Sequence, residues 1–213
     1  MNVALEAAAH GKQLDTIVDS ITRDETDPFT FWMALLAYST EHPEAQDRLI
    51  ALAKALRTRH VCMLDGEKLW EDLPKLKWAL RENFEMYDDT EDEPNEFVNT
   101  NKMYAKCVKE GIVDTLMFAV ICFRTALEEK NVGDAEVQFK ALHAWVEIAG
   151  DILYNEGKPH YESSPLCRGG ALWKGGPGIT KERWEFWGKR IEELGSNSNT
   201  SKSLLECMKK ISS

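Results

Sequence analysis

Apolar residues recur along almost the whole chain at intervals of three and four, the spacing that places side chains on one face of an α-helix. The stripe formed by Leu14, Ile17, Val18 and Ile21 is an early example. Runs of alternating polar and apolar residues, which are typical of β-strands, are hard to find in this sequence. The pattern therefore predicts an all-α fold, a single-domain antiparallel bundle of about seven to nine helices.

Capping and turn residues divide this pattern into separate helices. Asp27 followed by Pro28 is typical of a helix start, and Pro43 opens the next helix in the same way. Thr180 is the expected cap of a late helix, and Gly195 ends it. Helices are expected near residues 14–21, 29–40, 43–56, 74–84, 96–109, 112–129, 134–154, 180–194 and 204–211. Residues 1–194 are predicted to form the helical domain, and residues 195–213 a flexible linker with a short C-terminal helix.

The stretch from Ile112 to Glu129 is apolar on nearly every side, which is typical of a helix in the centre of a bundle. It also contains Asp114 and Arg124, and a charged group in such surroundings must be paired. One interpretation is an internal ion pair or a hydrogen bond to the glycine-rich loop farther along the chain. The other is that these residues are polar anchors in an apolar pocket for a small ligand.

The loop from Gly169 to Gly178 has the sequence GGALWKGGPG, a composition in which phosphate binding has to be considered. It does not fit a P-loop, because Lys174 precedes the glycine that it should follow and Pro177 lacks an amide hydrogen. We expect that the loop is ordered against the bundle and is held there by Leu172 and Trp173. In that position the loop could also form the lid of a pocket.

Metal and acid–base chemistry finds little support in the sequence. The segment from Asp88 to Glu96 is rich in carboxylates but lacks the spacing of an EF-hand, so we expect a solvated loop. His143, Glu147 and Asp151 share one face of a predicted helix, and we interpret that face as solvent-exposed. The five cysteines are widely spaced without a CxxC pair, which indicates reduced thiols. The sequence therefore predicts no cofactor and no metal.

Composition and charge narrow the class of protein further. The chain has 213 residues, 26 of them basic and 36 acidic, and a formal net charge of −10. This sign of charge argues against binding to a phosphate backbone. The longest apolar region is too short and too interrupted for a membrane span, and the first residues do not resemble a signal peptide. We expect a cytoplasmic protein whose partner is a small molecule or another protein, and neither nucleic acid nor a membrane.

Four segments carry a resemblance to a known family. They are LWEDLPKLKWALRENF (Leu69 to Phe84), NTNKMYAKCV (Asn99 to Val108), FAVICFRTALEE (Phe118 to Glu129) and GGALWKGGPGITKERWEFWGKR (Gly169 to Arg190). These segments resemble the ordered motifs of a fungal family catalogued as domain of unknown function 3632, over roughly residues 69–194. The resemblance implies an intracellular fungal helical protein. It brings no established activity and no catalytic residues to this chain.

Two functions fit these observations. The first is a helical binding or interaction module without metal or nucleotide chemistry. The second is a cofactor-independent enzyme of small-molecule metabolism, such as a cyclase or lyase, which would shape an apolar aromatic pocket with a few polar anchors. The candidate pocket residues are Arg81, Asp114, Arg124, Trp145, Trp173 and Trp184. A closed pocket with an unpaired arginine would favour the enzyme, whereas an exposed apolar patch on a solid core would favour the module.

Overall fold

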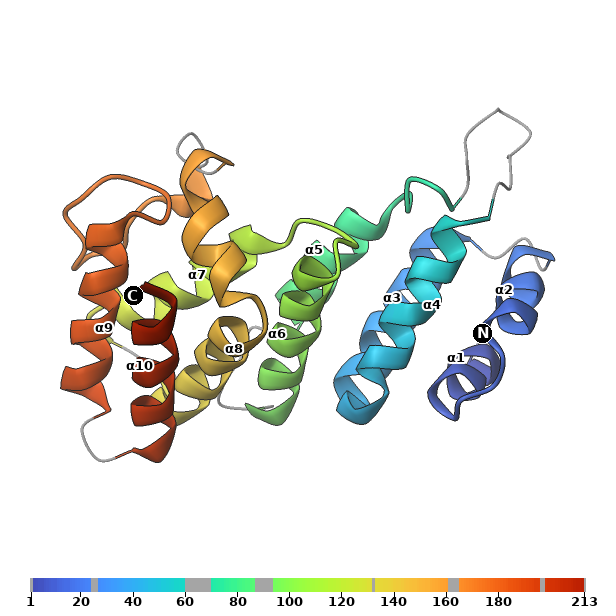
Figure 1. Cartoon of the computed structure of the whole chain (residues 1–213), viewed down its shortest axis with the longest axis horizontal. Coiled ribbons are helices and arrows are strands. Elements are labelled where there is room, and N and C mark those ends of the chain that lie inside the picture. Colours follow the sequence, from blue (N-terminus) through green and yellow to red (C-terminus); the bar gives the residue numbers. More distant parts are fainter. Residues whose placement is uncertain are drawn as a thin grey trace. The chain divides into compact units, whose positions relative to one another are not determined.

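The computed structural model describes residues 2–23, 27–59, 70–86, 94–131, 133–160, 165–195 and 198–212. Within these ranges all regular secondary structure is helical (Figure 1). The described residues form ten α-helices and two short 3₁₀-helices. The predicted all-α class is confirmed. The described helices outnumber the seven to nine expected, in part because the alanine-rich α1 (Asn2–Ala9) was not expected from the pattern.

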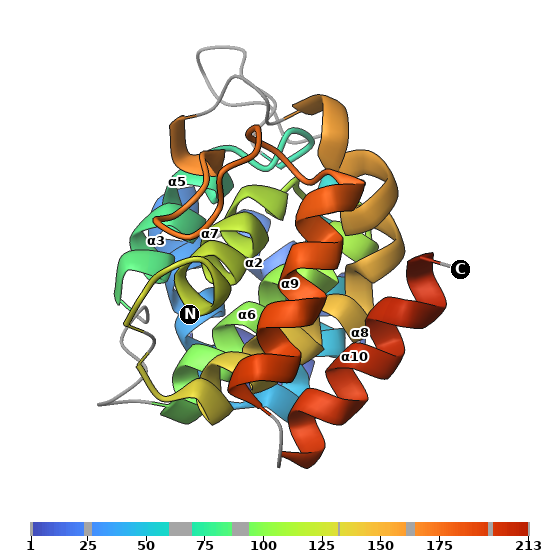
Figure 2. The ribbon, with the colours of Figure 1, turned by 90° about the vertical axis from the view of Figure 1, so that its left-hand side faces the viewer.

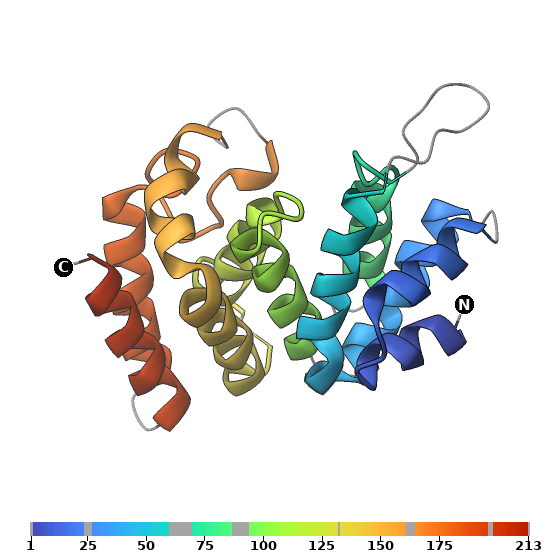
Figure 3. The ribbon, with the colours of Figure 1, turned by 45° about the vertical axis from the view of Figure 1, so that its right-hand side comes forward.

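The chain groups into two compact units, Met1–Asp88 and Asp89–Ser213. The first contains α1, α2 (Leu14–Arg23), α3 (Pro28–Glu41), η1 (Pro43–Ala45), α4 (Gln46–Arg57) and α5 (Leu76–Met86), drawn from blue to blue-green in Figure 3. Helix α3 packs against α5, while α1 and α2 both contact α4. In the core of this first unit, the rings of Phe31, Trp32 and Trp70 pack edge to face. As the sequence indicates, Asp27 caps α3, because its Oδ2 accepts a hydrogen bond from the Thr30 amide at 2.9 Å.

The second unit is built around one long helix. It contains α6 (Pro94–Lys109), α7 (Leu116–Leu127), α8 (Ala135–His160), η2 (Pro165–Cys167), α9 (Lys181–Leu194) and α10 (Asn199–Ser212). Helix α8 contacts α6, α7, α9 and α10, and α10 also contacts α9 beside it (Figure 2). The expected helix from Ile112 begins at Leu116, and the residues before it form a connection.

A buried asparagine joins three helices of this unit. Asn101 on α6 accepts hydrogen bonds through its Oδ1 from Trp145 Nε1 on α8 at 2.8 Å and from the Cys122 thiol on α7 at 2.9 Å. Its Nδ2 donates to the Phe97 carbonyl at 2.9 Å. Each polar group of this contact is therefore satisfied inside the core, as buried polar groups require.

The glycine-rich loop is packed on the helices, so the expectation that it is ordered is confirmed. The Leu172 amide donates to the main-chain carbonyl of Glu128 at 2.8 Å. The Trp173 ring lies 5.3 Å from the ring of Phe186 on α9. Thr180 caps α9 as expected, because its hydroxyl accepts a hydrogen bond from the Arg183 amide at 3.2 Å.

Other expectations fall partly outside the described residues. Of the acidic segment from Asp88 to Glu96, only Pro94–Glu96 are described, and they begin α6. None of the helices in the described ranges is both long enough and apolar enough to cross a membrane. Cys62 also lies outside the described residues, whereas Cys107, Cys122, Cys167 and Cys207 are free thiols.

The thiols should differ sharply in reactivity. Burial raises the pKa of Cys107 and of Cys122 to about 12, whereas Cys207 is partly exposed. At pH 8 the two buried groups would be ionised to about one part in ten thousand, and only the thiolate reacts. We expect a maleimide reagent to label Cys207 in the native protein and to reach Cys107 and Cys122 only after unfolding, as followed by peptide mass spectrometry. Equal labelling rates in the native state would contradict the burial of these two thiols.

Candidate functional site

A carboxylate and a guanidinium lie fully buried within the second unit. Glu128 directly follows α7, and Arg183 lies in the first turn of α9. Arg183 Nε is 2.6 Å from Glu128 Oε1, and Arg183 Nη2 is 3.0 Å from Glu128 Oε2, so the ion pair is bidentate. Charges in such a place are tolerated only where their hydrogen-bonding positions are filled.

The Glu128 carboxylate also accepts hydrogen bonds from uncharged groups. Trp187 Nε1 on α9 donates to Oε1 at 2.7 Å, and the Gly170 amide of the loop donates to Oε2 at 2.7 Å. Together with the Leu172 amide on its main-chain carbonyl, Glu128 receives hydrogen bonds from two separate segments. One residue therefore holds both α9 and the glycine-rich loop against the end of α7.

Arg183 binds the last residue of η2, just before the same loop, and the last residue of the loop itself. Its Nη1 donates to the carbonyl of Cys167 at 3.0 Å and to the carbonyl of Gly178 at 2.7 Å. The guanidinium carbon lies 5.2 Å from the centroid of the Trp187 ring, within the range of a cation–π contact. The loop is thus closed around the ion pair.

Glycine is required at one point of this arrangement. A Cβ added at Gly170 would lie 2.8 Å from the Cβ of Glu128 and 2.9 Å from its main-chain oxygen. Any side chain would push the loop away from the carboxylate that its amide contacts. The absence of a side chain at position 170 is therefore a packing requirement of the ion pair.

The ion pair performs the role that the sequence analysis considered for Arg124 and Asp114, an internal pair bonded to the loop. Sequence reasoning did not select Glu128 or Arg183. One signal was available, because Arg183 precedes Trp187 by four residues and so falls on the apolar stripe of α9. A charged residue in a buried stripe indicates a paired charge.

The polar candidates predicted from the sequence occupy different surroundings. Arg81 on α5 is 70% exposed and forms an ion pair with a glutamate one turn later. Asp114 is exposed, and its Oδ1 accepts a hydrogen bond from the Leu116 amide at 3.1 Å, at the start of α7. Arg124 is partly buried on α7, and its main-chain carbonyl accepts from the Glu128 amide at 2.9 Å. Their role as pocket anchors stays a prediction.

The aromatic candidates also differ from one another. Trp145 is fully buried and belongs to the Asn101 contact described above. Trp173 is partly exposed on the loop, and its Nε1 donates to the Gly176 carbonyl at 2.8 Å. Trp184 is buried on α9 and lines an open groove between α9 and α10. Of these three tryptophans, Trp184 is the one that lines this groove.

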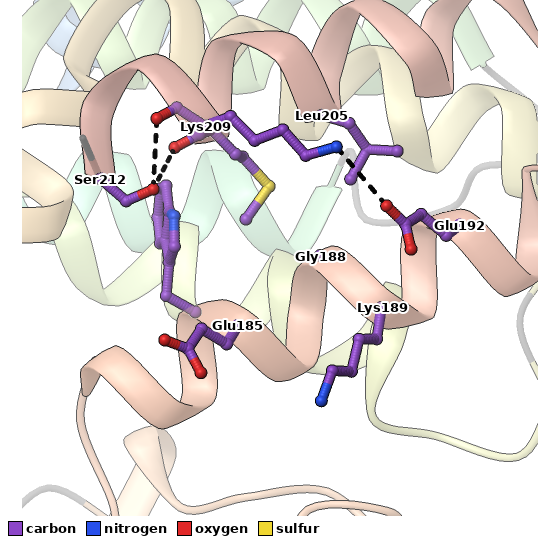
Figure 4. A pocket seen from close by; sticks show the side chains of 9 residues that line it. Glu185, Gly188, Lys189, Glu192, Leu205, Lys209 and Ser212 are labelled. Atoms are coloured by element: carbon purple, nitrogen blue, oxygen red, sulfur yellow. Dashed lines mark hydrogen bonds and ion pairs between the residues drawn. The ribbon is translucent and has the colours of Figure 1, made fainter.

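The groove has a volume of about 350 Å³ and is shown in Figure 4. It is lined by Trp184, Glu185, Gly188, Lys189 and Glu192 from α9 and by Leu205, Met208, Lys209 and Ser212 from α10. Charged side chains from both helices stand at this groove, and Lys209 reaches toward Glu192 with 3.6 Å between Nζ and Oε1. The apolar surface is supplied by the tryptophan, the leucine and the methionine, as in many small-ligand sites.

The indole of Trp184 is braced by other aromatic rings. Tyr154 lies edge to face with it at 5.2 Å between centroids, and the rings of Phe123 and Trp187 lie at 6.2 Å. Among the described residues, its Nε1 has no hydrogen-bond acceptor. The groove wall therefore contains an aromatic ring that is packed against three others and whose indole nitrogen is buried.

Gly188 lies in the interior of the α9 sequence and has open space where a side chain would be. A Cβ added there would meet only Leu205 Cδ2, at 4.0 Å, so the structure leaves room for a side chain. Glycine in a helix interior lowers stability by about 0.5–1 kcal/mol relative to alanine. No packing contact explains this glycine, which is one of the residues that line the groove.

A second groove, of about 330 Å³, lies between α8 and α10, next to a bend of α8 at Ala149, where φ is −130° and ψ is 18°. Near it, the face of α8 interpreted as solvent-exposed is partly covered. His143 is 23% exposed, and its Nε2 lies 2.9 Å from the Ser203 hydroxyl of α10. Glu147 and Asp151 are exposed, as expected. In the described part of the chain, no group of three or more His, Cys, Asp or Glu residues could hold a metal ion.

A comparison of the chain with protein families gives a match. The family model described as "Protein of unknown function (DUF3632)" matches residues 32–191, which is more than half of the chain. No curated protein and no solved structure matches the chain.

The ion pair should dominate the stability of the second unit. Replacing Arg183 by Met leaves a buried carboxylate without its partner, and we expect the free energy of unfolding to fall by about 3–5 kcal/mol in urea titrations. Arg81→Met is the matched control, because it breaks an exposed ion pair and should change the free energy by about 0.5 kcal/mol or less.

The double variant Glu128→Leu, Arg183→Met removes both charges. We expect its loss of free energy of unfolding to be smaller than the sum of the losses of the two single variants. Each single variant leaves one buried charge without a partner, whereas the double variant leaves none. Additive losses, or an Arg183→Met loss as small as that of the Arg81 control, would contradict the structural role of the pair.

Proposed function

The chain belongs to the family described as protein of unknown function DUF3632, and we propose that it is a binding module whose ligand site is the groove between α9 and α10. In this proposal the protein recognises its partner without metal or nucleotide chemistry. The observation that carries it is Gly188, an interior helix glycine with open space where its side chain would be. A residue that lowers helix stability without a packing reason is expected where a surface serves recognition.

The charged groups of the second unit support the same proposal. Glu128 and Arg183 are engaged by each other and by main-chain and indole groups of the fold. Groups bound in this way stabilise the fold and are not free to act on a substrate. The α9–α10 groove is accessible, and it has apolar walls and side chains of both charges.

The alternative, a cyclase or lyase, would need the predicted anchors at one apolar pocket. Arg81 forms its exposed ion pair on α5, and Asp114 Oδ1 accepts a hydrogen bond from the Leu116 amide at the start of α7. These contacts give the enzyme no specific support, so the binding module is preferred. The exposed Trp78, with the Phe29 ring 4.4 Å away, adds an apolar surface patch of the kind that recognition surfaces contain.

We also infer that the protein works in the cytoplasm, with a small molecule or a protein as its partner. Four free thiols among the described residues agree with a reducing compartment. The net charge of −10 opposes binding to nucleic acid. The fungal origin implied by the resemblance stays a prediction.

Filling the groove tests the proposal. Leucine at position 188 should occupy the open space, and it should raise or preserve stability because leucine is a better helix former than glycine. We expect aromatic fragments that shift the amide NMR signals of α9 and α10 in the parent protein to bind Gly188→Leu at least about tenfold more weakly.

Lys202→Leu is the matched control, because it adds the same side chain to an exposed position of α10 that does not line the groove. It should leave fragment binding unchanged. The proposal fails if a set of uncharged, anionic and cationic fragments leaves the α9 and α10 signals unmoved, or if binding to Gly188→Leu equals binding to the parent.

A further inference from the structure

We propose that α10 is an internal occupant of a helix-binding channel formed by α8 and α9, and that a basic amphipathic helix of a partner protein takes its place. This inference goes beyond the proposed function, because it concerns the surface that α10 covers and not the groove beside α10. It is carried by the open space along α10, by the inward row of α10 side chains and by the charges around them.

Helix α10 fills only the middle of the channel between α8 and α9. A groove of about 350 Å³ lies between α10 and α9, and another of about 330 Å³ lies between α10 and α8. Figure 2 shows α10 on the outside of the second unit, where it contacts both helices. Close packing against both neighbours would leave little space of this kind. Helix α10 is therefore a peripheral element with open space along both of its sides.

A row of side chains at helical spacing anchors α10 in the channel. Ser201, Leu204 and Met208 are buried, and Ile211 continues the row toward the end of the helix. Ile211 packs on Gly150 of α8, next to the bend of that helix, and a Cβ added at Gly150 would overlap Ile211 Cδ1. The channel thus has a seat for an aliphatic side chain. Anchors at i, i+4 and i+7 are the pattern by which a groove recognises an amphipathic helix.

The polar contacts of α10 are of a kind that water can replace. Ser198, which directly precedes α10, and Thr200 each donate a hydrogen bond at 2.5 Å to the Glu136 carboxylate of α8, in partly buried positions. The ion pair between Lys209 and Glu192 is exposed. Such contacts contribute little net stability, in contrast to the buried ion pair that holds α9. The structure therefore allows α10 to open while α9 stays in place.

The charges around the channel favour a basic helix. Among the residues that line the two grooves, α8 and α9 contribute four carboxylates and one ammonium group, and α6 adds Lys109. From the same set, α10 contributes Lys209 and Lys210 and no carboxylate. The charged groove residues of α8 and α9 are Glu147, Asp151, Glu185, Lys189 and Glu192. An acidic rim thus surrounds a basic helix, and this complementarity selects the charge of a partner.

A peptide with the sequence of residues 198–212, labelled with fluorescein and carrying Cys207→Ser to prevent disulfide formation, tests whether the channel accepts an unattached helix. Leu204→Asp in the full-length chain places a charge at a buried position of α10 and leaves α8 and α9 unchanged. By fluorescence anisotropy, the peptide should bind this variant at least about tenfold more tightly than the parent. In the parent, α10 competes at the high effective concentration of a tethered segment.

Lys202→Asp is the matched control, because it makes the same substitution at an exposed position of α10 that lines neither groove. It should leave peptide binding as weak as in the parent. A folded Leu204→Asp variant that binds the peptide no better than this control overturns the proposal.

Hydrogen exchange of the parent protein decides the question if Leu204→Asp does not fold. The amides of α10 should exchange at least about a hundredfold faster than those in the middle of α8, because α10 opens while the rest of the unit stays folded. One common rate, with the same dependence on urea, would show that α10 leaves only when the unit unfolds. That result overturns the proposal.

The class of partner is tested with a second peptide that carries Lys209→Glu and Lys210→Glu. It should bind Leu204→Asp at least about tenfold more weakly than the first peptide at low salt, and the difference should shrink at high salt. Equal binding of the two peptides overturns the basic partner.

Light scattering tests the other possible occupant, the α10 of a second copy. The parent should be a monomer, and a dimer that dissociates when the first peptide is added would overturn the partner protein in favour of a second copy. The fragment test of the proposed function uses neither Leu204→Asp nor the peptides. Failure of either proposal therefore leaves the other standing.

Discussion

Burying a carboxylate and a guanidinium together is favourable only if nearly every hydrogen-bonding position of both groups finds a partner. Glu128 and Arg183 meet this condition with protein groups drawn from four segments: the end of α7, η2, the glycine-rich loop and α9. Because the partners are main-chain and indole groups at fixed positions, the pair specifies one arrangement of these segments. The arrangement of this end of the second unit depends on it.

The geometry of the α9–α10 groove also depends on the Glu128–Arg183 ion pair. Arg183 and Trp187 place the first two turns of α9, and Trp184 and Gly188 are the residues that directly follow them in the sequence. The side of α9 that meets α10 is therefore set by the side that meets Glu128. The ion pair stabilises the fold, and the neighbouring face of the same helix is left for recognition.

Sequence patterns predicted the helices well because burial of one helix face repeats with the helical period. The caps at Asp27 and Thr180 could be predicted since their chemistry is local. The ion pair could not, because its partners lie 55 residues apart and periodicity gives a face but not its partner. Arg124 and Asp114 were selected from an apolar stretch whose first residues proved to be a connection and not a helix.

The groove could be predicted from the sequence even less than the ion pair. Trp184 was one of the candidate pocket residues and is buried on α9, but its place at the groove and the space over Gly188 depend on how α9 and α10 pack. Packing of two helices is a property of three-dimensional contact.

Amide hydrogen exchange of the native protein tests most directly that the ion pair orders the loop. The Gly170 and Leu172 amides donate to Glu128, whereas Gly176 of the same loop is exposed. The amides of Gly170 and Leu172 should exchange as slowly as those of the helix core, and the Gly176 amide as fast as an open chain. If all three amides exchange at the fast rate of Gly176, the loop is not held by Glu128 and the central role of the pair is contradicted.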